Sequence, residues 1–262
     1  MTYTTSAPLA SLPTDLHGKV ALVTGGSRGI GRAIALKFAS LGANVVINYS
    51  SSKQAAESVV AEIQQLGKKA IAIEGNVANE ADANRLIEST ISHFKRLDVL
   101  VNNAGVFTGS PVESVTTEDY RKTVGVNIDG VFYVTRAAVP HISENGTILN
   151  VSSIITKSPF PNVSVYTLTK AAVEGFTRAL AVELAPRKIR VNAISPGYTD
   201  SDMLRGGGDG FVAAGIEASV FKRLGTPEDI AETAAFLAVP RSGAWVTGAN
   251  ILSNGGAAGF SI

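Results

Sequence analysis

Short apolar runs rich in valine and isoleucine recur along the chain, and stretches with helical spacing of apolar and polar positions separate them. Runs of this length that are almost continuously apolar are typical of parallel strands buried on both faces. They predict strands at 20–24, 44–48, 70–74, 98–102, 147–151, 190–194 and 250–252, and helices at 30–41, 53–66, 80–94, 118–142, 166–184 and 227–239. The alternation predicts an α/β fold with a doubly wound parallel sheet.

No internal repeat and no change of composition divides the chain, so we expect residues 18–262 to form a single domain. Residues 1–17 are expected to form a flexible tail. A glycine cluster, Gly206-Gly207-Gly208, follows no strand and indicates a mobile substrate lid over about residues 199–224. Residues 226–229, Thr-Pro-Glu-Asp, predict a helix start, because threonine caps, proline suits the first turn and acids favour the positive helix end.

The composition narrows the class of protein. Of the 262 residues 45% are hydrophobic, which is enough for a substantial core, and a formal net charge of +1 indicates no nucleic-acid partner. The chain has no cysteine, so disulfides and thiolate chemistry are excluded, and its histidines show no metal-ligand spacing. No apolar run approaches the roughly 20 residues that span a membrane, and residues 1–13 lack the features of a secretory signal. We therefore expect a cytoplasmic enzyme that uses no metal and no membrane.

A glycine-rich turn joins the first predicted strand to the first predicted helix, and residues 24–31 read Thr-Gly-Gly-Ser-Arg-Gly-Ile-Gly. Glycines there let the chain turn sharply and approach a pyrophosphate, toward which the helix N-terminus offers free N–H groups. An ordinary glycine turn is the alternative, but the strand before and the helix after favour a dinucleotide site of the Rossmann type. The expected cofactor contacts are Gly25, Ser27, Arg28, Gly29, Ile30 and Gly31.

The second predicted strand ends without the acidic residue that usually holds the ribose hydroxyls of NAD. Its end reads Asn48-Tyr49-Ser50-Ser51 instead. Arg28, Ser50, Ser51 and Lys53 offer donors and positive charge to a 2′-phosphate, and Asn48 and Tyr49 are also expected to contact the cofactor. The serines can also cap the next helix, and the two roles are compatible. The pattern favours NADP(H) over NAD(H) as the cofactor.

The pattern Tyr-x-x-x-Lys occurs twice, at Tyr49…Lys53 and at Tyr166…Lys170. On a helix it puts both side chains on one face, where a lysine ammonium is expected to lower the pKa of the phenol and make the tyrosine an acid or base. Tyr49 lies at the end of a strand, near the expected adenosine end of the cofactor. Tyr166 begins a long helix after the fifth strand, which ends near Ser153. We assign the chemistry to Tyr166 and Lys170, with Ser153 binding the substrate oxygen.

Six motifs occur in a fixed order: Thr24-Gly25-x-x-x-Gly29-x-Gly31, Asn102-Asn103-Ala104-Gly105, Asn127, Ser153, Tyr166-x-x-x-Lys170 and Pro196-Gly197. With them, residues 18–256 resemble the short-chain dehydrogenases/reductases, and are similar to the 3-oxoacyl-acyl-carrier-protein reductases and fungal naphthol reductases of that family. The resemblance implies that Tyr166 donates a proton to the carbonyl and that Lys170 lowers its pKa and binds the nicotinamide ribose. It also implies that Ser153 orients the substrate oxygen and that Asn127 holds a water linking Lys170 to solvent.

The resemblance implies cofactor contacts beyond the glycine turn and a homotetrameric assembly. Two positions depart from the family pattern. Asn76 stands where an aspartate usually contacts adenine, and Ser253-Asn254 replace a frequent Val-Asp pair. The further contacts implied are Asn76, Val77, Asn103, Ala104, Gly105, Pro196, Gly197, Thr199 and Ser201.

Apolar residues are expected to line the substrate pocket, which favours a ketone with a hydrophobic or aromatic substituent. Lys157 and Arg205 are the candidate anchors for a charged substrate. The expected pocket residues are Ile155, Phe160, Val163, Tyr198, Met203 and Phe211.

Our leading hypothesis is the NADPH-dependent reduction of a ketone to a secondary alcohol. A 3-oxoacyl-acyl-carrier-protein reductase uses the same chemistry but needs a basic docking face for its acidic carrier. A non-catalytic dinucleotide-sensing protein is the alternative from another class, although it has no need of Ser153, Tyr166 and Lys170. Residues 131–140 carry one charge, Arg136, which indicates burial of this helix either against a second subunit of a homo-oligomer or within its own domain.

Overall fold

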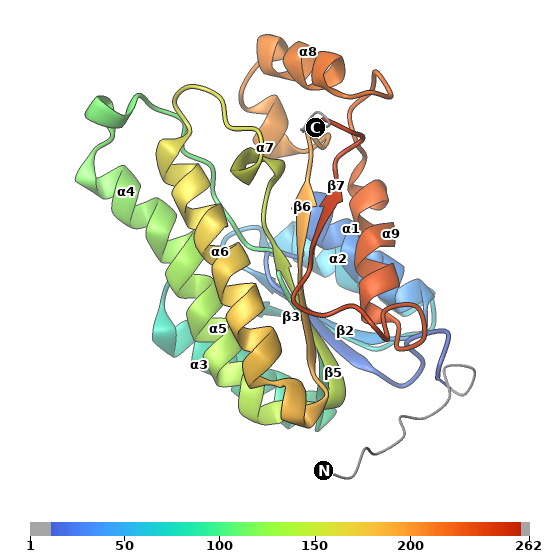
Figure 1. Cartoon of the computed structure of the whole chain (residues 1–262). Coiled ribbons are helices and arrows are strands. Elements are labelled where there is room, and N and C mark those ends of the chain that lie inside the picture. Colours follow the sequence, from blue (N-terminus) through green and yellow to red (C-terminus); the bar gives the residue numbers. More distant parts are fainter. Residues whose placement is uncertain (1–11, 258–262) are drawn as a thin grey trace, which may run out of the picture.

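A seven-stranded parallel sheet forms the centre of the molecule, whose computed structural model describes residues 12–257 (Figure 1). The strand order is β3-β2-β1-β4-β5-β6-β7. The order reverses between β1 and β4, and ligands of such sheets bind beyond the carboxyl ends of the strands at that point. The strands are β1 Val20–Val23, β2 Asn44–Tyr49, β3 Ala70–Glu74, β4 Leu97–Asn102, β5 Ile142–Val151, β6 Arg190–Pro196 and β7 Asn250–Ser253.

Helices cover both faces of the sheet, as the doubly wound prediction requires (Figure 1). One face is covered by α1 Gly29–Ser40, α2 Lys53–Gln65 and α9 Pro227–Ala238, and the other by α3 Glu80–Phe94, α5 Gly130–Ala138 and α6 Ser164–Glu183. The helix α4 Thr117–Val124 precedes α5 and packs against α6.

The two faces of the sheet carry separate hydrophobic cores, which explains why the strands are apolar at almost every position. In β1, Ala21 and Val23 pack into the core under α1 and α9, whereas Leu22 packs into the core under α3 and α5. In β2, Val45 and Ile47 lie on the first side and Val46 on the second. The side chains alternate between the faces because successive residues of a strand point to opposite sides.

The predicted helix 118–142 is where sequence and structure differ most. The helical segment includes a π-helical stretch at Gly125–Asp129 and ends in a 3₁₀ turn, Val139–His141, after which β5 begins at Ile142. Pro140 ends the α-helix because it cannot donate the backbone hydrogen bond that would continue it. The strand therefore starts five residues before the predicted start at 147.

The predicted lid contains two helices that the sequence did not indicate, α7 Asp202–Arg205 and α8 Asp209–Ala218. They lie beyond the carboxyl end of β6, at the top of Figure 1. Thr199 pairs with Gly225, so the lid leaves and rejoins the domain at one place. Its mobility stays a prediction.

The N-terminal tail ends at an earlier residue than the predicted residue 17. Leu16 is 1% exposed within the core, and its backbone N–H donates to Leu41 O. The N–H of Arg241 donates to Pro13 O. Residues 13–17 therefore pack on the domain, and the rest of the predicted tail, residues 1–11, lies outside the described residues.

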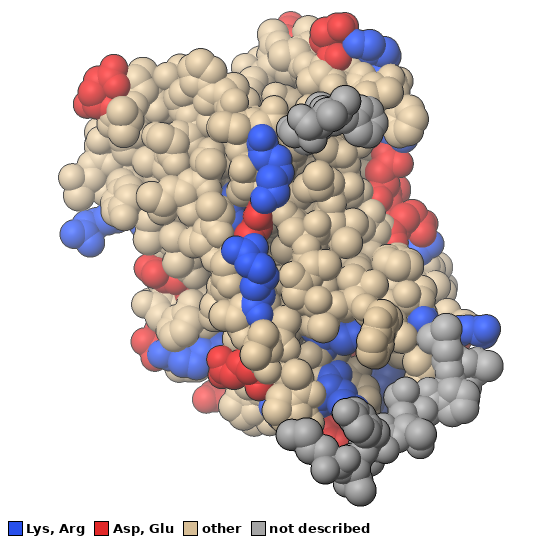
Figure 2. Space-filling model, viewed as in Figure 1, with Lys and Arg blue, Asp and Glu red and all other residues tan. Residues whose placement is uncertain are grey.

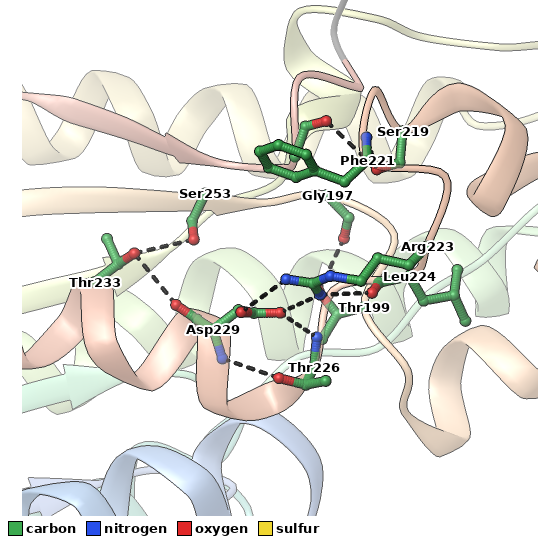
Figure 3. A network of polar contacts seen from close by, with 11 residues as sticks. Gly197, Thr199, Ser219, Phe221, Arg223, Leu224, Thr226, Asp229, Thr233 and Ser253 are labelled. Atoms are coloured by element: carbon green, nitrogen blue, oxygen red, sulfur yellow. Dashed lines mark hydrogen bonds and ion pairs between the residues drawn. The ribbon is translucent and has the colours of Figure 1, made fainter.

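The predicted start of α9 is confirmed as a capping box (Figure 3). Thr226 Oγ1 accepts from Asp229 N, and Asp229 Oδ2 accepts from Thr226 N at 2.7 Å. Arg223 Nη1 also donates to Asp229 Oδ2, at 2.6 Å. These contacts lower the pKa of Asp229 to about 2, Arg223 being the largest cause. The network anchors the returning end of the lid to the first turn of α9.

Candidate active site

A cavity of about 1060 Å³ lies at the carboxyl ends of the strands, where the topology places a ligand site. Ser50 follows β2 and Ser153 follows β5, so the cavity crosses three strand spacings, roughly 14 Å. Its lining includes the following predicted residues: Gly25, Ser27, Arg28, Gly29, Ile30, Gly31, Asn48, Tyr49, Ser50, Ser51, Asn76, Val77, Asn103, Ala104, Gly105, Ser153, Tyr166, Lys170, Pro196, Gly197, Thr199 and Ser201.

The glycine turn forms a cradle that has no room for side chains. Gly25 has φ +61°, in the left-handed region that favours glycine. A Cβ on Gly31 would lie against Gly25 O and 2.5 Å from Asn103 Nδ2. The first N–H groups of α1 have no partner within the helix, and they begin at this turn. A backbone cradle at a helix N-terminus fits the pyrophosphate of a dinucleotide.

Two of the predicted cofactor residues brace this turn. Asn48 is 2% exposed; its Oδ1 accepts from Gly25 N and its Nδ2 donates to Gly75 O at 2.9 Å. Asn103 Nδ2 donates to Thr24 O at 2.9 Å and to Gly25 O at 3.1 Å. Their amides therefore hold the glycine turn against the ends of the neighbouring strands, in addition to lining the cavity.

The end of the cavity beyond β2 carries hydroxyls and the Arg28 guanidinium. Ser50, Ser51 and Arg28 all line it, and the Arg28 side chain is 67% exposed, with Nη1 3.7 Å from Asp202 Oδ2. Lys53, from the other Tyr-x-x-x-Lys pattern, pairs instead with Glu57. This end therefore presents hydroxyl donors and the Arg28 guanidinium to a ligand.

The structure brings Ser153, Tyr166 and Lys170 together at the other end. Tyr166 and Lys170 lie one turn apart on α6, and Ser153 caps the 3₁₀ turn Ile154–Thr156 and hydrogen-bonds to Tyr166. Lys170 Nζ donates to Val151 O at 2.8 Å and lies 5.7 Å from the centroid of the Tyr166 ring.

The predicted lowering of the pKa of Tyr166 is wrong. Burial raises the pKa of Tyr166 to about 12, against a smaller opposing effect of the hydrogen bond with Ser153. Burial also lowers the pKa of Lys170 to about 8. Lys170 does not contribute to this shift: its Nζ lies 5.7 Å from the centroid of the Tyr166 ring, and burial favours its own neutral form.

Asn127 lies behind the cavity wall, in the π-helical stretch, and is fully buried. Its Nδ2 donates to Val106 O at 2.9 Å and to Thr169 Oγ1 at 3.1 Å, and its Oδ1 accepts from Val106 N. The side chain thus fixes the chain after β4 against α6. The implied water between Asn127 and Lys170 stays a prediction.

Aromatic rings surround the cavity beside Tyr166. The Phe211 ring on α8 lies 6.2 Å from that of Phe107, 5.4 Å from that of Phe160 and 5.8 Å from that of Tyr198. Phe107 meets Tyr166 edge to face at 5.1 Å. Sequence reasoning missed Phe107, although it lies two residues after the motif Asn102-Asn103-Ala104-Gly105, which begins at the end of β4. Ile155 and Met203 also line the cavity, as predicted.

Three other sequence predictions need correction. Val163 is 2% exposed at the N-cap of α6 and does not line the cavity. Lys157 and Arg205, the candidate anchors for a charged substrate, are bound to carboxylates of the chain itself. Lys157 pairs with Glu174 at 3.0 Å, and Arg205 pairs with Asp200 at 2.7 Å.

Residues 12–257 contain neither a membrane-spanning helix nor a cluster of metal-ligating side chains. No helix in this range is long and apolar enough to cross a membrane. No group of three or more histidine, cysteine, aspartate or glutamate residues there is placed to hold a metal ion.

Comparisons with known proteins agree with this geometry. The family model described as "Enoyl-(Acyl carrier protein) reductase" matches residues 25–258. An uncharacterized oxidoreductase of Methylorubrum extorquens is 47% identical over 93% of this chain and 99% of its own length. A hydroxynaphthalene reductase-like protein of Metarhizium acridum is 39% identical over 95% and 98% of the two chains.

A solved structure completes the comparison. The short-chain dehydrogenase of Burkholderia cenocepacia in complex with NADP superposes with a TM-score of 0.89 at 39% identity, covering 93% of this chain and 99% of that one. With its seven-stranded parallel sheet and its cavity at the strand ends, this chain is an oxidoreductase that belongs to the short-chain dehydrogenase/reductase family.

Proposed function

We propose that this protein reduces a ketone to a secondary alcohol with NADPH. The observation that carries the proposal is the placement of Ser153, Tyr166 and Lys170 at one end of a cavity whose other end holds the glycine turn and Arg28. A sensor needs the second end but has no use for the first.

The residues that fit the cofactor are the glycine turn for the pyrophosphate, and Arg28, Ser50 and Ser51 for a 2′-phosphate. The neighbour in complex with NADP supports this preference. When bound, the reduced nicotinamide supplies the hydride that attacks the carbonyl carbon.

Tyr166 supplies the proton that balances the hydride. A pKa of about 12 keeps its phenol protonated at neutral pH, which is the form an acid needs. Ser153, whose side chain lies beside the phenol, donates its one hydroxyl proton to the same carbonyl oxygen and holds that oxygen in reach. We expect Lys170, on the next turn of the helix, to bind the nicotinamide ribose and to bring a positive charge close to Tyr166.

The aromatic wall favours a flat ketone over an acyl thioester. Phe107, Phe160, Tyr198 and Phe211 offer ring faces and edges to a substrate beside Tyr166. The similarity to the hydroxynaphthalene reductase-like protein of Metarhizium acridum supports an aromatic substrate. Lys157 and Arg205 already pair with Glu174 and Asp200, so fewer free cations remain beside the lid to bind an acidic acyl-carrier protein.

The test follows NADPH consumption with a bicyclic aromatic ketone, an aryl methyl ketone and an acetoacetyl thioester. We expect the aromatic ketones to have the highest kcat/KM. A strong preference for the thioester would place the protein with the carrier-protein reductases instead. Tight NADPH binding without consumption of any carbonyl would support the sensor.

We also propose that the chain forms a homotetramer through two apolar surfaces. The first lies on α5 and α6, where Phe132 is 42%, Leu168 50% and Val182 78% exposed; in Figure 2 this side of the molecule is mostly tan, with a column of blue and red side chains running down it. The second includes Phe236, which lies on α9 and is 48% exposed, and Trp245, which follows α9 and is 97% exposed. Two separate self-complementary surfaces generate a tetramer. Sedimentation is expected to give four copies, and Val182→Glu to give a smaller assembly.

A further inference from the structure

A buried glutamate lies beside the proposed catalytic residues without touching the cavity. Glu174 follows Lys170 by one helical turn on α6, and it is 5% exposed. Burying a carboxylate is costly unless its oxygens are paired. Here both oxygens have partners, and every one of these partners comes from the segment around Ser153.

The contacts of Glu174 fall on both sides of Ser153. Its Oε1 accepts from Ser152 Oγ at 3.2 Å and from Thr156 Oγ1 at 2.5 Å. Its Oε2 accepts from Lys157 Nζ at 3.0 Å. Ser152 precedes Ser153, whereas Thr156 and Lys157 follow it within four residues.

We propose that Glu174 is a positioning residue that fixes the hydroxyl of Ser153 relative to Tyr166; the proposal rests on the proposed reductase function. One carboxylate ties the segment 152–157 to α6, which is the helix that carries Tyr166 and Lys170. Ser153, the proposed hydrogen-bond donor, is therefore tied to the same helix that carries Tyr166, the proposed acid. Without that tie, the 3₁₀ turn that Ser153 caps is held to α6 by fewer contacts.

The neighbouring contacts support a clamp rather than a proton path. Ser152 Oγ lies 3.2 Å from Lys170 O as well, so its hydroxyl faces α6 and not the substrate. Thr156 Oγ1 lies 3.1 Å from Ser153 O, so the clamped hydroxyl contacts the backbone of the residue to be positioned. Lys157, with its side chain 48% exposed, supplies the cation that neutralises the carboxylate.

The first test compares kcat, KM and the NADPH dissociation constant for Glu174→Ala and Glu174→Gln. A shift of about 1 Å in a reacting group costs on the order of 100-fold in rate, so we expect Glu174→Ala to lower kcat by about 10- to 100-fold. Its NADPH affinity should change by less than about twofold. Glu174→Gln keeps an oxygen acceptor for Ser152 and Thr156 and should stay within about fivefold of the wild type.

A double-mutant cycle separates positioning from general damage to the helix. If Glu174 acts through Ser153, then Glu174→Ala should cause no further loss beyond about twofold in a Ser153→Ala background. Equal losses in both backgrounds would overturn the proposal. The control is Glu183→Ala, which removes an exposed carboxylate from the same helix and should leave kcat unchanged.

Hydrogen exchange over residues 150–160 reads the clamp without any turnover. We expect exchange there to accelerate in Glu174→Ala but not in Glu183→Ala, with the rest of α6 unchanged. Unchanged exchange would refute the clamp even if the protein reduces ketones. Faster exchange in a protein that reduces no ketone would refute the proposed function and leave the clamp in place.

Discussion

We expect Arg28 to determine the preference for NADPH over NADH, and Arg28→Ala tests this role directly. The side chain lines the cavity next to Ser50 and Ser51 and makes a single long ion pair with Asp202, at 3.7 Å. A 2′-phosphate is a stronger partner because it carries nearly two charges at neutral pH.

The magnitude follows from the exposure of Arg28. A charge-assisted hydrogen bond contributes about 1.5–3 kcal/mol when it is well shielded, but this side chain is 67% exposed, so we take about 1–2 kcal/mol. At about 1.4 kcal/mol for each tenfold, Arg28→Ala should weaken NADPH by about 5- to 30-fold. NADH has no 2′-phosphate, so its affinity should change by less than about twofold.

The assay is a fluorescence titration of both cofactors at two salt concentrations, because exposed charges are screened by salt. The matched control is Arg178→Ala, which removes an exposed arginine of α6 that does not line the cavity. Asp202→Asn should tighten NADPH, by up to about fivefold, because it removes the competing carboxylate. Equal weakening of NADPH and NADH by Arg28→Ala would refute the reasoning.

Three further predictions test other parts of the molecule. Gly31→Ala should weaken NADPH and NADH alike, by about tenfold or more, because its Cβ would lie 2.5 Å from Asn103 Nδ2; unchanged affinities would contradict the cradle. Asp229→Asn should lower the free energy of unfolding by about 1 kcal/mol at neutral pH, a value reduced for a side chain 40% exposed. The pKa of Asp229 is lowered to about 2, so the difference in free energy of unfolding between the wild type and Asp229→Asn should persist above about pH 4 and shrink as the pH falls towards 2. Denaturation measured at each pH tests this, and a difference that stays constant down to about pH 2 would contradict the prediction. The kcat/KM of ketone reduction should fall as the pH rises through about 8, because Lys170 loses its proton there while Tyr166 keeps its own until about 12; a profile flat to pH 10 would be inconsistent with this assignment.

The sheet could be predicted because the sequence repeats one physical signal. Strands buried on both faces need apolar residues at nearly every position, and the seven predicted runs all lie within observed strands except for one residue, Thr24. The two lid helices could not be predicted, since glycines at 206–208 and 210 oppose helix formation. Packing between distant residues holds them, as with Phe211 against Phe160 and Tyr198.

The site was predictable wherever a residue follows the carboxyl end of a strand. Gly25, Ser50, Ser153 and Gly197 all reach the cavity for that topological reason. Glu174 and the environment of Tyr166 were not predictable, because burial and contact across space determine them. The shift in the pKa of Tyr166 was predicted in the wrong direction for the same reason. The sequence shows that Lys170 lies one helical turn from Tyr166, but it does not show that the Lys170 ammonium donates to Val151 O.

A single-turnover experiment with Tyr166→Phe, NADPH and the best ketone of the panel tests whether Tyr166 supplies the proton. The substitution removes one oxygen, the proton donor, and leaves the ring that packs against Phe107. We predict that NADPH binds within about threefold of wild-type affinity and that its oxidation slows by about 100- to 10,000-fold, the range for loss of a general acid. Oxidation at the wild-type rate would show that Tyr166 does not supply the proton.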